Sequence, residues 1–512
     1  MTMYQNPILY ADYSDPDVIR VGEDYYMVAS SFTYLPGVPL LHSRDLVHWE
    51  IINYCVRSLP FEKYDKPSHG SGTWAPSIRF HDGIFYVFVP LPDEGIFVAR
   101  SADPYGEFAL NCLHPAKGWI DPCPFWDDDG KAYMVFAYAN SRSGIKHRLD
   151  LVEMDSQCTK LLGEPVTIFD GKQLGPTTEG PKLYKYRGYY YILMPSGGVA
   201  NGWQSALRAE SVTGPYEYRI VMHQGNTDVN GPHQGGWVTG TDGRHWFIHF
   251  QDVIELGRIT HLQPLCFNAG WPFIGSEQNG DGIGEPVKEW DIPAEGQPEY
   301  RIAQSDDFSG NRLGLQWQWQ ANPQDSFYSL KGHSGIRLSC LANPARENLL
   351  WYAPNAMTQI PKHQAFSAVT KVKLKGKKTG DMAVIGMIGH SYAYMGLMKT
   401  ETGNQLVLYS GTVIQKEYEG EAKEIREVSC PCEKDTVYLK VEVFRNKTYR
   451  FFWSADGIRY TPIGGANSLR RATWTGAKLC LWSSNKNNVI SEGYGEYDFI
   501  HIEDRSSCET GL

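Results

Sequence analysis

The sequence lacks the features that mark several common protein classes. Its ten cysteines lie far apart in the 512 residues, and Cys430-Pro431-Cys432 is the only close pair. A zinc site needs at least two well-spaced pairs or a histidine partner, and a one-residue gap is awkward for a disulfide. We therefore expect mostly reduced core thiols, which favours the cytoplasm.

Long apolar runs and basic clusters are also missing. No run of apolar residues is long enough for a membrane-spanning helix, and the N-terminal residues show no basic region or apolar core of a secretory signal. Lysine and arginine are scattered, and the formal net charge is -10. Neither a nucleic acid nor an anionic membrane gains electrostatic support as a partner, so we expect a neutral or small one. The oligomeric state stays open.

The first part of the chain contains a repeat of about fifty residues. Five units each begin with a polar or aromatic residue and lead into a β-prone run, such as Tyr25-Tyr26-Met27-Val28. A sandwich shows no such long-range period, whereas radial blades around a channel do, so we predict a five-bladed β-propeller. The units begin 47 to 59 residues apart, at Asp15, Trp74, Asp121, Glu179 and His233.

Turn formers separate the two halves of every unit. Asp-Gly pairs and their relatives supply the positive φ of tight hairpins, so each unit should begin as a strand, a two-residue turn and a second strand. Helical periodicity is hard to find in this region. The turns are predicted at Gly22-Glu23-Asp24, Asp82-Gly83, Asp129-Gly130, Arg187-Gly188 and Asp242-Gly243.

The residues that begin the units should occupy equivalent places, where each innermost strand meets the mouth of the channel. Three of them are the acids Asp15, Asp121 and Glu179. Two carboxyls that flank a scissile bond perform glycoside hydrolysis, and a third can keep the general acid protonated by like-charge repulsion. Acids before strands are also common turn formers on the surface, so spacing alone leaves both roles open.

The remainder of the chain has a different pattern. Turn formers gather between Ile292 and Pro298, so we place a linker there, with one domain over 1–295 and another over 300–512. Beyond it, apolar and polar residues alternate, as in 366–374 and 437–444. This period of two predicts a β-sandwich and makes the whole chain all-β.

The order of several short motifs resembles glycoside hydrolase family 43, in particular its two-domain β-xylosidases and α-L-arabinofuranosidases. The resemblance covers nearly the whole chain and implies a five-bladed propeller that carries an Asp, Asp, Glu set in this order. The motifs are Ser14-Asp15-Pro16-Asp17, Thr73-Trp74-Ala75-Pro76, Ile120-Asp121-Pro122 and Thr178-Glu179-Gly180-Pro181, extended by Ser31-Phe32, Pro36-Gly37-Val38-Pro39-Leu40, 42–49 and Leu256-Gly257-Arg258.

The resemblance implies that Asp15 is the general base and Glu179 the general acid, and that Asp121 tunes and orients Glu179. It also implies inversion of configuration, which places a water between base and sugar and separates the two working carboxyls by roughly 6.5–9.5 Å. Asp17 lies two residues beyond Asp15 on the same face and is a rival base. The motif favours Asp15.

Three further residues are predicted to bind the substrate. Trp74 and Phe32 would pack against the sugar ring, although ordinary core packing is the alternative for both. Arg258 matches an arginine that hydrogen-bonds sugar hydroxyls, and its alternative is a structural ion pair. The following residues 259–261 differ from the Glu-Thr-Ala of related β-xylosidases, which leaves the leaving-group preference open.

A structural calcium ion is a further expectation from relatives. His233 could face the channel and hold calcium through water, or it could be a satisfied polar core group. Asp307 and Asp498 could lie near a second calcium in the sandwich.

We predict an exo-acting, inverting glycoside hydrolase that releases terminal β-D-xylose from xylo-oligosaccharides and requires no cofactor for its chemistry. A loop of the sandwich that reaches over the propeller would close the pocket. An α-L-arabinofuranosidase or a bifunctional enzyme is the alternative within this class. A non-catalytic sugar-binding propeller is the alternative outside it.

Overall fold

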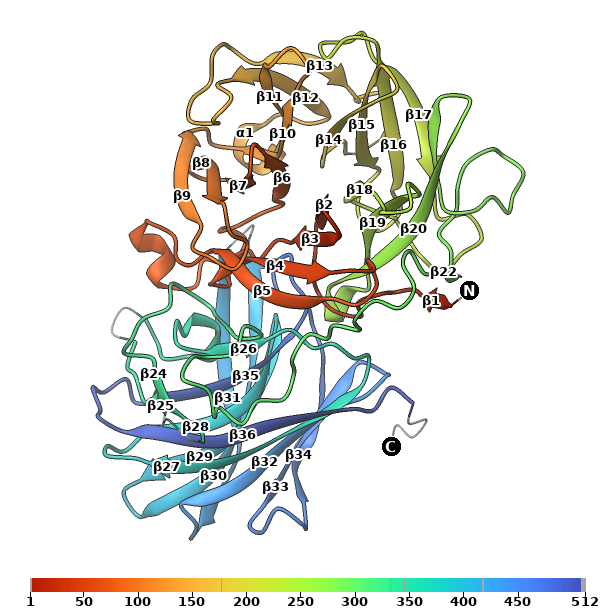
Figure 1. Ribbon diagram of the computed structural model, residues 1–512. Helices are drawn as coiled ribbons and strands as arrows, with labels where there is room; N and C mark the ends of the chain where they lie inside the picture. The colour runs from red at the N-terminus through yellow and green to blue at the C-terminus, as the bar shows by residue number, and fades with distance from the viewer. Residues whose placement is uncertain are drawn as a thin grey trace.

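A computed structural model describes residues 2–175, 177–330, 332, 334–343, 346–416 and 419–507. Figure 1 shows a five-bladed β-propeller above a two-sheet β-sandwich, so the predicted all-β architecture is confirmed. Helical segments in these residues are single turns, and none is long and apolar enough to cross a membrane. They are α1 (Asn140–Ser143), η1 (Glu62–Asp65), η2 (Ile254–Leu256) and η3 (Leu350–Tyr352).

Each blade is an antiparallel sheet of four consecutive strands, which is why the sequence repeats. Blade 1 contains β2 (Asp17–Val21), β3 (Asp24–Val28), β4 (Gly37–Ser43) and β5 (Glu50–Val56), and blade 2 contains β6 (Ser77–His81), β7 (Ile84–Leu91), β8 (Gly95–Ser101) and β9 (Ala109–His114). Blade 3 contains β10 (Trp119–Trp126), β11 (Ala132–Tyr138), β12 (Arg148–Met154) and β13 (Val166–Asp170). Blade 4 contains β14 (Lys182–Tyr186), β15 (Tyr189–Ser196), β16 (Trp203–Ala209) and β17 (Glu217–Met222), and blade 5 contains β18 (Gly235–Thr239), β19 (His245–Asp252), β20 (Arg258–Asn268) and β21 (Trp271–Ile274).

Three of the five predicted two-residue hairpin turns form. At Asp82-Gly83 and Arg187-Gly188 both residues have positive φ, as a type I′ turn requires, and Gly22 has a φ of 64° in the first hairpin. The other two predictions are wrong. The β10–β11 and β18–β19 connections are five-residue loops, 127–131 and 240–244. The last cross-strand residue pair of each hairpin lies farther from the Asp-Gly pair than a two-residue turn requires.

The propeller ring is closed outside the blades. The N-terminal strand β1 (Met3–Gln5) pairs with β22 (Glu289–Asp291), which follows the last blade. Leu9 bridges to Thr260 of β20, and β18 packs beside β2. The N-terminal segment therefore joins the first blade to the fifth.

Two seven-stranded sheets form the second domain, with a shared core of aliphatic and aromatic side chains between them. The predicted boundary at 295–300 falls between β22 and the first sandwich strand. Residue 1 of the first predicted domain and residues 508–512 of the second lie outside the described residues. One sheet has the order β23 (Gln318–Trp319), β26 (Met357–Gln359), β35 (Lys478–Asn485), β28 (Asp381–Ile388), β29 (Ser391–Thr400), β30 (Gly403–Lys416) and β31 (Glu419–Cys432). The other has the order β24 (Tyr328–Leu330), β25 (Ile336–Ser339), β36 (Tyr494–Asp504), β27 (Phe366–Lys375), β32 (Thr436–Val443), β33 (Thr448–Ser454) and β34 (Thr461–Ser468).

The two domains share apolar contacts as well as polar ones. Blade 1 faces the sandwich (Figure 1), and Leu35 forms a β-bridge with Trp319. The rings of His69 and Trp351 stack with centroids 3.6 Å apart. Leu256 of η2 packs into the sandwich core itself. The hydrophobic core therefore continues across the domain boundary.

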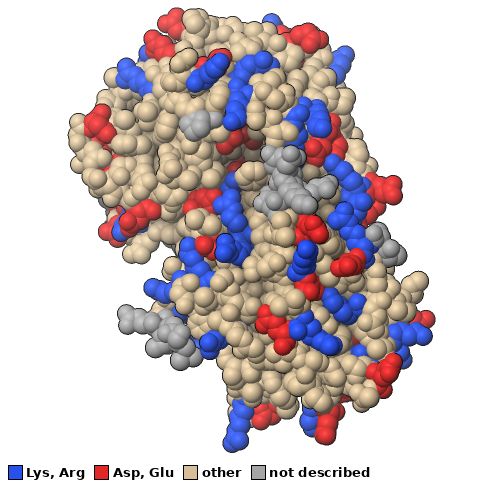
Figure 2. All heavy atoms as spheres, turned by 180° about the vertical axis from the view of Figure 1, so that it is seen from behind, with Lys and Arg blue, Asp and Glu red and all other residues tan. Residues whose placement is uncertain are grey.

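Charge is mixed on the surface. On the face shown in Figure 2, basic and acidic side chains are interspersed over both domains. That face presents no large area of a single sign.

Candidate active site

Asp15 lies just before β2, at the start of blade 1. Its φ is 55° and only 5% of its surface is exposed. Ser30 Oγ donates to its Oδ2 at 2.5 Å, and Arg258 Nη1 donates to its Oδ1 at 3.1 Å and to its Oδ2 at 3.4 Å. A neighbouring guanidinium stabilises a carboxylate. Asp15 is thus held in place as a charged acceptor.

Asp121 occupies the corresponding place in blade 3. It has a φ of 54° and is 4% exposed, and it lies where the pairing of β10 with β11 shifts register. The backbone N–H of Gly180 donates to Asp121 Oδ2 at 2.7 Å. Because Gly180 adjoins Glu179, this bond ties the two acids together across the blades.

Glu179 precedes β14 and is the most accessible of the three acids. Its side chain is 31% exposed, and His233 Nε2 lies 3.0 Å from its Oε1. His233 itself is buried at the start of blade 5. Among the three carboxyls, Glu179 is therefore the one that an incoming molecule reaches most directly.

The predicted equivalence of the unit starts is wrong by one residue for two of them. Within the motifs of these units, Asp15, Asp121 and Gly180 precede the proline of the motif with a positive φ, at 55°, 54° and 61°. Glu179 lies one residue before this position, as does Trp74, which precedes Ala75-Pro76. The offset gives Glu179 a position different from that of Asp15.

Burial and like charge govern the protonation of this cluster. Burial, followed by repulsion from Glu179 and Asp15, raises the pKa of Asp121 to about 8. Burial also acts to raise the pKa of Glu179, but the His233 hydrogen bond and the charges of His233 and Arg258 outweigh it and lower that pKa. The expectation that Asp121 would raise the pKa of Glu179 is thus reversed in the free protein, because His233 supports the Glu179 carboxylate. With these directions, Asp121 is the acid of the pair that favours its proton and Glu179 the one that favours its charge.

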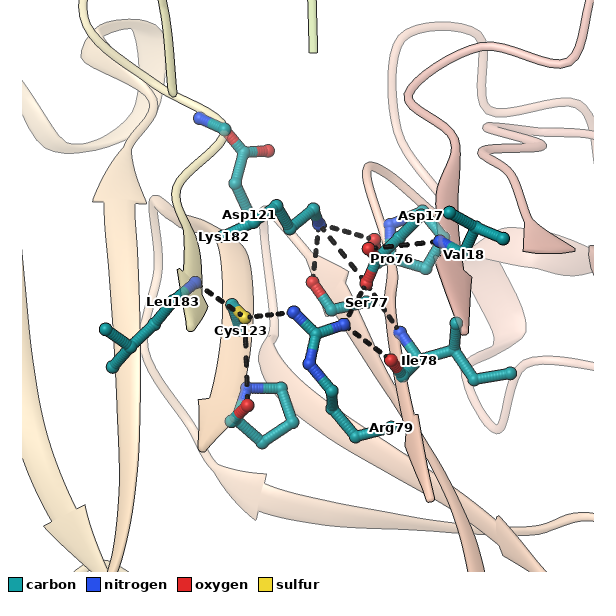
Figure 3. Close-up of polar contacts among 12 residues, drawn as sticks. Asp17, Val18, Pro76, Ser77, Ile78, Arg79, Asp121, Cys123, Lys182 and Leu183 are labelled. Carbon is teal, nitrogen blue, oxygen red and sulfur yellow. Dashed lines mark hydrogen bonds and ion pairs between the residues drawn. The ribbon is translucent and has the colours of Figure 1, made fainter. Parts of the chain in front are cut away.

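Asp17, the rival base, is fully engaged below the mouth of the channel. It is 0% exposed, and its Oδ2 accepts bonds from the backbone N–H of Ile78 at 2.9 Å and from Arg79 Nη1 at 2.7 Å (Figure 3). Lys182 Nζ lies 3.9 Å from the same oxygen. A carboxylate with these partners has no accessible oxygen for a water, which favours Asp15 as the base.

The two predicted aromatic residues lie together, with a third that the sequence did not suggest. Phe32 and Trp74 meet edge to face with centroids 6.3 Å apart. Trp474, in a loop of the sandwich, meets Trp74 edge to face at 6.2 Å. Trp74 is only half-buried, and Arg142 covers part of its ring at 5.1 Å.

The loop that carries Trp474 is docked on the propeller at several points. Arg471 Nη1 donates to Asp252 Oδ2 at 2.9 Å, and the N–H of Gly476 donates to Asp12 Oδ2 at 2.9 Å. Asp12 Oδ1 accepts from the N–H of Arg258 at 2.8 Å. The buried Asp12 therefore connects this loop to the arginine that pairs with Asp15.

In the free protein Arg258 forms an ion pair with Asp15, which is the alternative to sugar binding considered for this residue. Its guanidinium is buried between Asp15 and the ring of Phe250, whose centroid lies 4.8 Å away. Burial acts to lower its pKa, but Asp15 and neighbouring acids outweigh it and raise that pKa. The Arg258 charge is therefore permanent at the site.

A calcium site is not shown in the described residues, where the three predicted ligands contact other protein groups. Calcium takes six to eight oxygen ligands, whereas Asp498 pairs with Lys371 Nζ at 2.8 Å and Asp307 accepts from Ser309 Oγ at 2.7 Å. His233 is committed to Glu179. Within the described residues, no group of three or more His, Cys, Asp and Glu side chains could hold a metal.

Sequence reasoning missed the partners that come from distant segments. The pairing of His233 with Glu179, the contact of Trp474 with Trp74, and the Asp12 connection leave no local pattern in the chain. The recurrent motif at the unit starts and the family resemblance both pointed to the acids, and nothing comparable marks the loop 471–477.

Two family models match the chain. "Glycosyl hydrolases family 43" matches residues 4–272, and "Beta xylosidase C-terminal Concanavalin A-like domain" matches residues 305–503. The first covers the propeller and the second the sandwich.

Individual relatives match over nearly the full length. A protein of Xylanibacter ruminicola named "Putative beta-xylosidase" is 38% identical over 93% of this chain and 86% of its own. A "Xylosidase/arabinosidase" of Butyrivibrio fibrisolvens is 26% identical over 98% of this chain and 100% of its own. The crystal structure of a family 43 protein from Bacillus licheniformis superposes with a TM-score of 0.84 at 26% identity, covering 98% of this chain and 100% of that one.

Proposed function

The chain belongs to glycosyl hydrolases family 43, an inverting family of glycoside hydrolases, and from this membership we propose that it releases terminal β-D-xylose from xylo-oligosaccharides. The observation that carries the proposal is the convergence of Asp15, Asp121 and Glu179 from three blades on one place, where the N–H of Gly180 beside Glu179 bonds to Asp121 and Arg258 pairs with Asp15. The name of the Xylanibacter ruminicola relative supports xylose as the sugar released.

The reaction assigned to this geometry is a single displacement. Asp15, whose carboxylate is fixed by Arg258 and Ser30, takes a proton from water as the water attacks the anomeric carbon. Glu179 gives its proton to the departing glycosidic oxygen. One C–O bond forms as the other breaks, so configuration inverts. Enzymes of this family need no cofactor for catalysis.

Substrate binding supplies the protonated form of Glu179. In the free protein the proton resides on Asp121, while the Glu179 carboxylate is partly exposed to water. A sugar that covers Glu179 removes this water and disfavours its charge, which draws the proton of the pair to Glu179. Asp121 thus acts as the store for the proton that Glu179 delivers.

Exo action follows from the sandwich loop. Trp474 approaches Trp74 at the mouth of the channel, and Arg471 and Gly476 anchor the loop. A barrier at this position blocks the mouth to a polysaccharide that would extend in both directions. A terminal sugar is the part of the substrate that then reaches the acids.

An α-L-arabinofuranosidase activity is the second candidate, because the Butyrivibrio fibrisolvens relative carries both activities in its name. The test is a turnover assay with paired 4-nitrophenyl β-D-xyloside and α-L-arabinofuranoside, followed on xylobiose by proton NMR. We expect a higher kcat/KM for the xyloside and initial release of α-xylose. Preference for the arabinofuranoside would make the second candidate the main activity, and binding without turnover of either sugar would indicate a sugar-binding propeller.

A further inference from the structure

Asp12 is a buried acid in the segment that leads into blade 1, and it holds a backbone donor from each domain. Only 5% of its surface is exposed. Its Oδ1 accepts from the N–H of Arg258 at 2.8 Å, and its Oδ2 accepts from the N–H of Gly476 at 2.9 Å. Arg258 begins β20 of the propeller, whereas Gly476 belongs to the sandwich loop 471–477. The two oxygens of one side chain therefore serve two different parts of the site.

Glycines allow this close approach. Gly257 has a φ of 88°, and a Cβ added there would overlap Asp12 Cγ. A Cβ added at Gly476 would overlap the carbonyl of Leu256. The junction of these segments thus has no room for a side chain at either glycine.

The hydrogen bonds require both oxygens of Asp12 to be acceptors, as they are in a carboxylate. Burial raises the pKa of Asp12, while the charge of Lys478, the two N–H bonds and the charge of Arg258 act to lower it. Lys478 comes from β35, with its Nζ 4.4 Å from the centre of the Tyr34 ring. An asparagine could accept only one of the two bonds, because its NH2 group is a donor.

The Oδ1 bond fixes the backbone from which Arg258 reaches the base. Arg258 Nη1 donates to Asp15 Oδ1 at 3.1 Å and to its Oδ2 at 3.4 Å. Asp12 lies on the same short segment as Asp15. Between them, the carbonyl of Tyr13 accepts from Thr260 Oγ1 at 3.4 Å. The start of β20 is therefore tied to the segment that carries the base.

The Oδ2 bond fixes the loop that carries Trp474. The N–H of Ala477, next in the chain to Gly476, donates to the carbonyl of Glu255 at 2.8 Å. Trp474 meets Trp74 edge to face at the mouth of the channel. Loss of the Gly476 bond should loosen Trp474 and weaken substrate binding.

We infer that Asp12 is a positioning residue with two functions in hydrolysis: its Oδ1 holds the arginine that orients the base, and its Oδ2 docks the sandwich loop at the mouth of the channel. The inference rests on the proposed hydrolytic function. Asp12 acts through Arg258 and Gly476, so its loss should affect both the chemical step and substrate binding.

The experiment measures kcat and KM on xylobiose for Asp12→Ala. We expect kcat to fall about tenfold or more, because Arg258 loses its fixed backbone, and KM to rise about two- to tenfold, because the loop loosens. Asp12→Asn is the milder variant if the alanine protein does not fold. It keeps one acceptor and should therefore lower kcat or raise KM. A lower Tm with both constants unchanged would overturn the inference.

Two double-mutant cycles distinguish positioning from a general loss of stability. In an Arg258→Met background the base has already lost its guanidinium, so Asp12→Ala should lower kcat by less than about twofold more. In a Trp474→Ala background, Asp12→Ala should likewise change KM by less than about twofold. Effects of Asp12→Ala that stay at full size in both backgrounds would show a merely structural role.

The matched control is Glu255→Gln, which neutralises another acid at the same domain boundary. Glu255 Oε2 pairs with Lys447 Nζ of the sandwich at 2.5 Å. The change breaks an ion pair between the domains and leaves both Asp12 bonds in place. Both kinetic constants should stay within about twofold of the wild type. Changes equal to those of Asp12→Ala would contradict the inference.

Hydrogen exchange followed by mass spectrometry separates this inference from the proposed function. The N–H groups of Arg258 and Gly476 should both exchange about tenfold faster or more in Asp12→Ala, and should keep their protection in Glu255→Gln. If neither glycoside is cleaved, the proposed function fails, while the exchange rates still decide whether Asp12 holds both segments. Unchanged protection of either N–H in Asp12→Ala would refute that role.

Discussion

At the scale of single residues, backbone geometry places two of the three acids. Asp15 and Asp121 adopt left-handed φ angles and each precedes a proline, a combination that few residues tolerate. Asparagine and aspartate accept this conformation better than other side chains. Substitution by asparagine therefore changes the charge of these sites while keeping their backbone, which makes it the informative change at both positions.

Leaving-group chemistry distinguishes the roles of Glu179 and Asp15. A general acid matters most when the departing oxygen is a poor leaving group, so Glu179→Gln should nearly abolish cleavage of xylobiose and spare an activated aryl xyloside. The base makes the nucleophile for every substrate, so Asp15→Asn should lose activity on both by ~10³-fold or more. Steady-state rates on the two substrates provide the measurement. Full aryl-xyloside activity in Asp15→Asn would refute the assignment.

The shared proton should set the alkaline side of the pH profile. With the pKa of Asp121 at about 8, the wild-type alkaline limb of kcat/KM should lie near that pH. Asp121→Asn leaves only Glu179 to hold the proton, and His233 lowers the pKa of that acid. The limb of the variant should therefore move to lower pH. An unchanged limb in a folded Asp121→Asn protein would exclude Asp121 as the partner of Glu179.

Asp121 should also make stability depend on pH. Its pKa rises from 3.8 to about 8 on folding, so its contribution is fully present below pH 3.8 and is lost as pH rises through about 8. Asparagine cannot ionise and has no such loss. The Tm of Asp121→Asn relative to wild type should increase steadily between these limits, as measured by thermal unfolding across the range. A constant difference would show that Asp121 is not protonated in the folded state.

At the scale of elements, the sequence predicts repeated hairpins well and their connections less well. The β-prone runs and the turns at Asp82-Gly83 and Arg187-Gly188 appear where expected, because the hairpin signal is local. The loop 127–131 is longer than predicted, because the backbone N–H of Asp127 closes on the carbonyl of Lys131 and Lys185 pairs with the Asp127 side chain. That second contact comes from another blade and is invisible in a local pattern.

The same reasoning explains which parts of the site the sequence predicts. Asp15, Asp121 and Glu179 share a motif with a following proline, and the motif marked them. The His233 bond to Glu179 spans blades, and the Trp474 contact with Trp74 spans domains. Tertiary packing alone creates these contacts, so no spacing rule could anticipate them.

The loop 471–477 should control substrate binding more than chemistry. Gly476 lies so close to η2 that an added Cβ would be 2.3 Å from the Leu256 carbonyl carbon, and Trp474 depends on this docking. Trp474→Ala and Gly476→Ala should each raise KM for xylobiose roughly two- to tenfold, the equivalent of about 0.5–1.5 kcal/mol, with a smaller change in kcat. Steady-state kinetics test this. Trp474→Phe is the control, and an unchanged KM in both alanine variants would remove the loop from the site.

At the scale of the whole molecule, the two domains are joined by a packed interface. Leu256 of the propeller lies in the sandwich core, and Tyr10 and Val253 pack against it. Asn322 of the sandwich segment donates to the carbonyl of Leu59 at 2.9 Å and accepts from its N–H at 2.8 Å. Such an interface combines the apolar character of a core with specific polar pairing, which favours a fixed rather than a hinged arrangement.

Removal of the sandwich should therefore abolish efficient turnover. A chain that ends at Gly296 loses Trp474 from the mouth of the channel, loses the Asp12 bond to Gly476, and exposes Leu256 to water. We expect a large loss of kcat/KM together with a lower Tm or aggregation, measured by kinetics and by light scattering. The full chain with Arg471→Ala provides the milder control. An isolated propeller with full activity would refute the role assigned to the sandwich.

The pairing of β1 with β22 has a consequence for how the protein is made. Because every blade consists of four consecutive strands, the strands of one blade can begin to pair before the later blades are synthesised. Met3–Gln5 is synthesised before the blades, yet its partner Glu289–Asp291 appears only after all five blades have been synthesised. Until then the N-terminal segment lacks the partner strand that joins the first blade to the fifth. The propeller ring closes only after the ribosome has translated the residues beyond the last blade. Before that point the unpaired strand edges are exposed to aggregation, and a chaperone that binds them would prevent it.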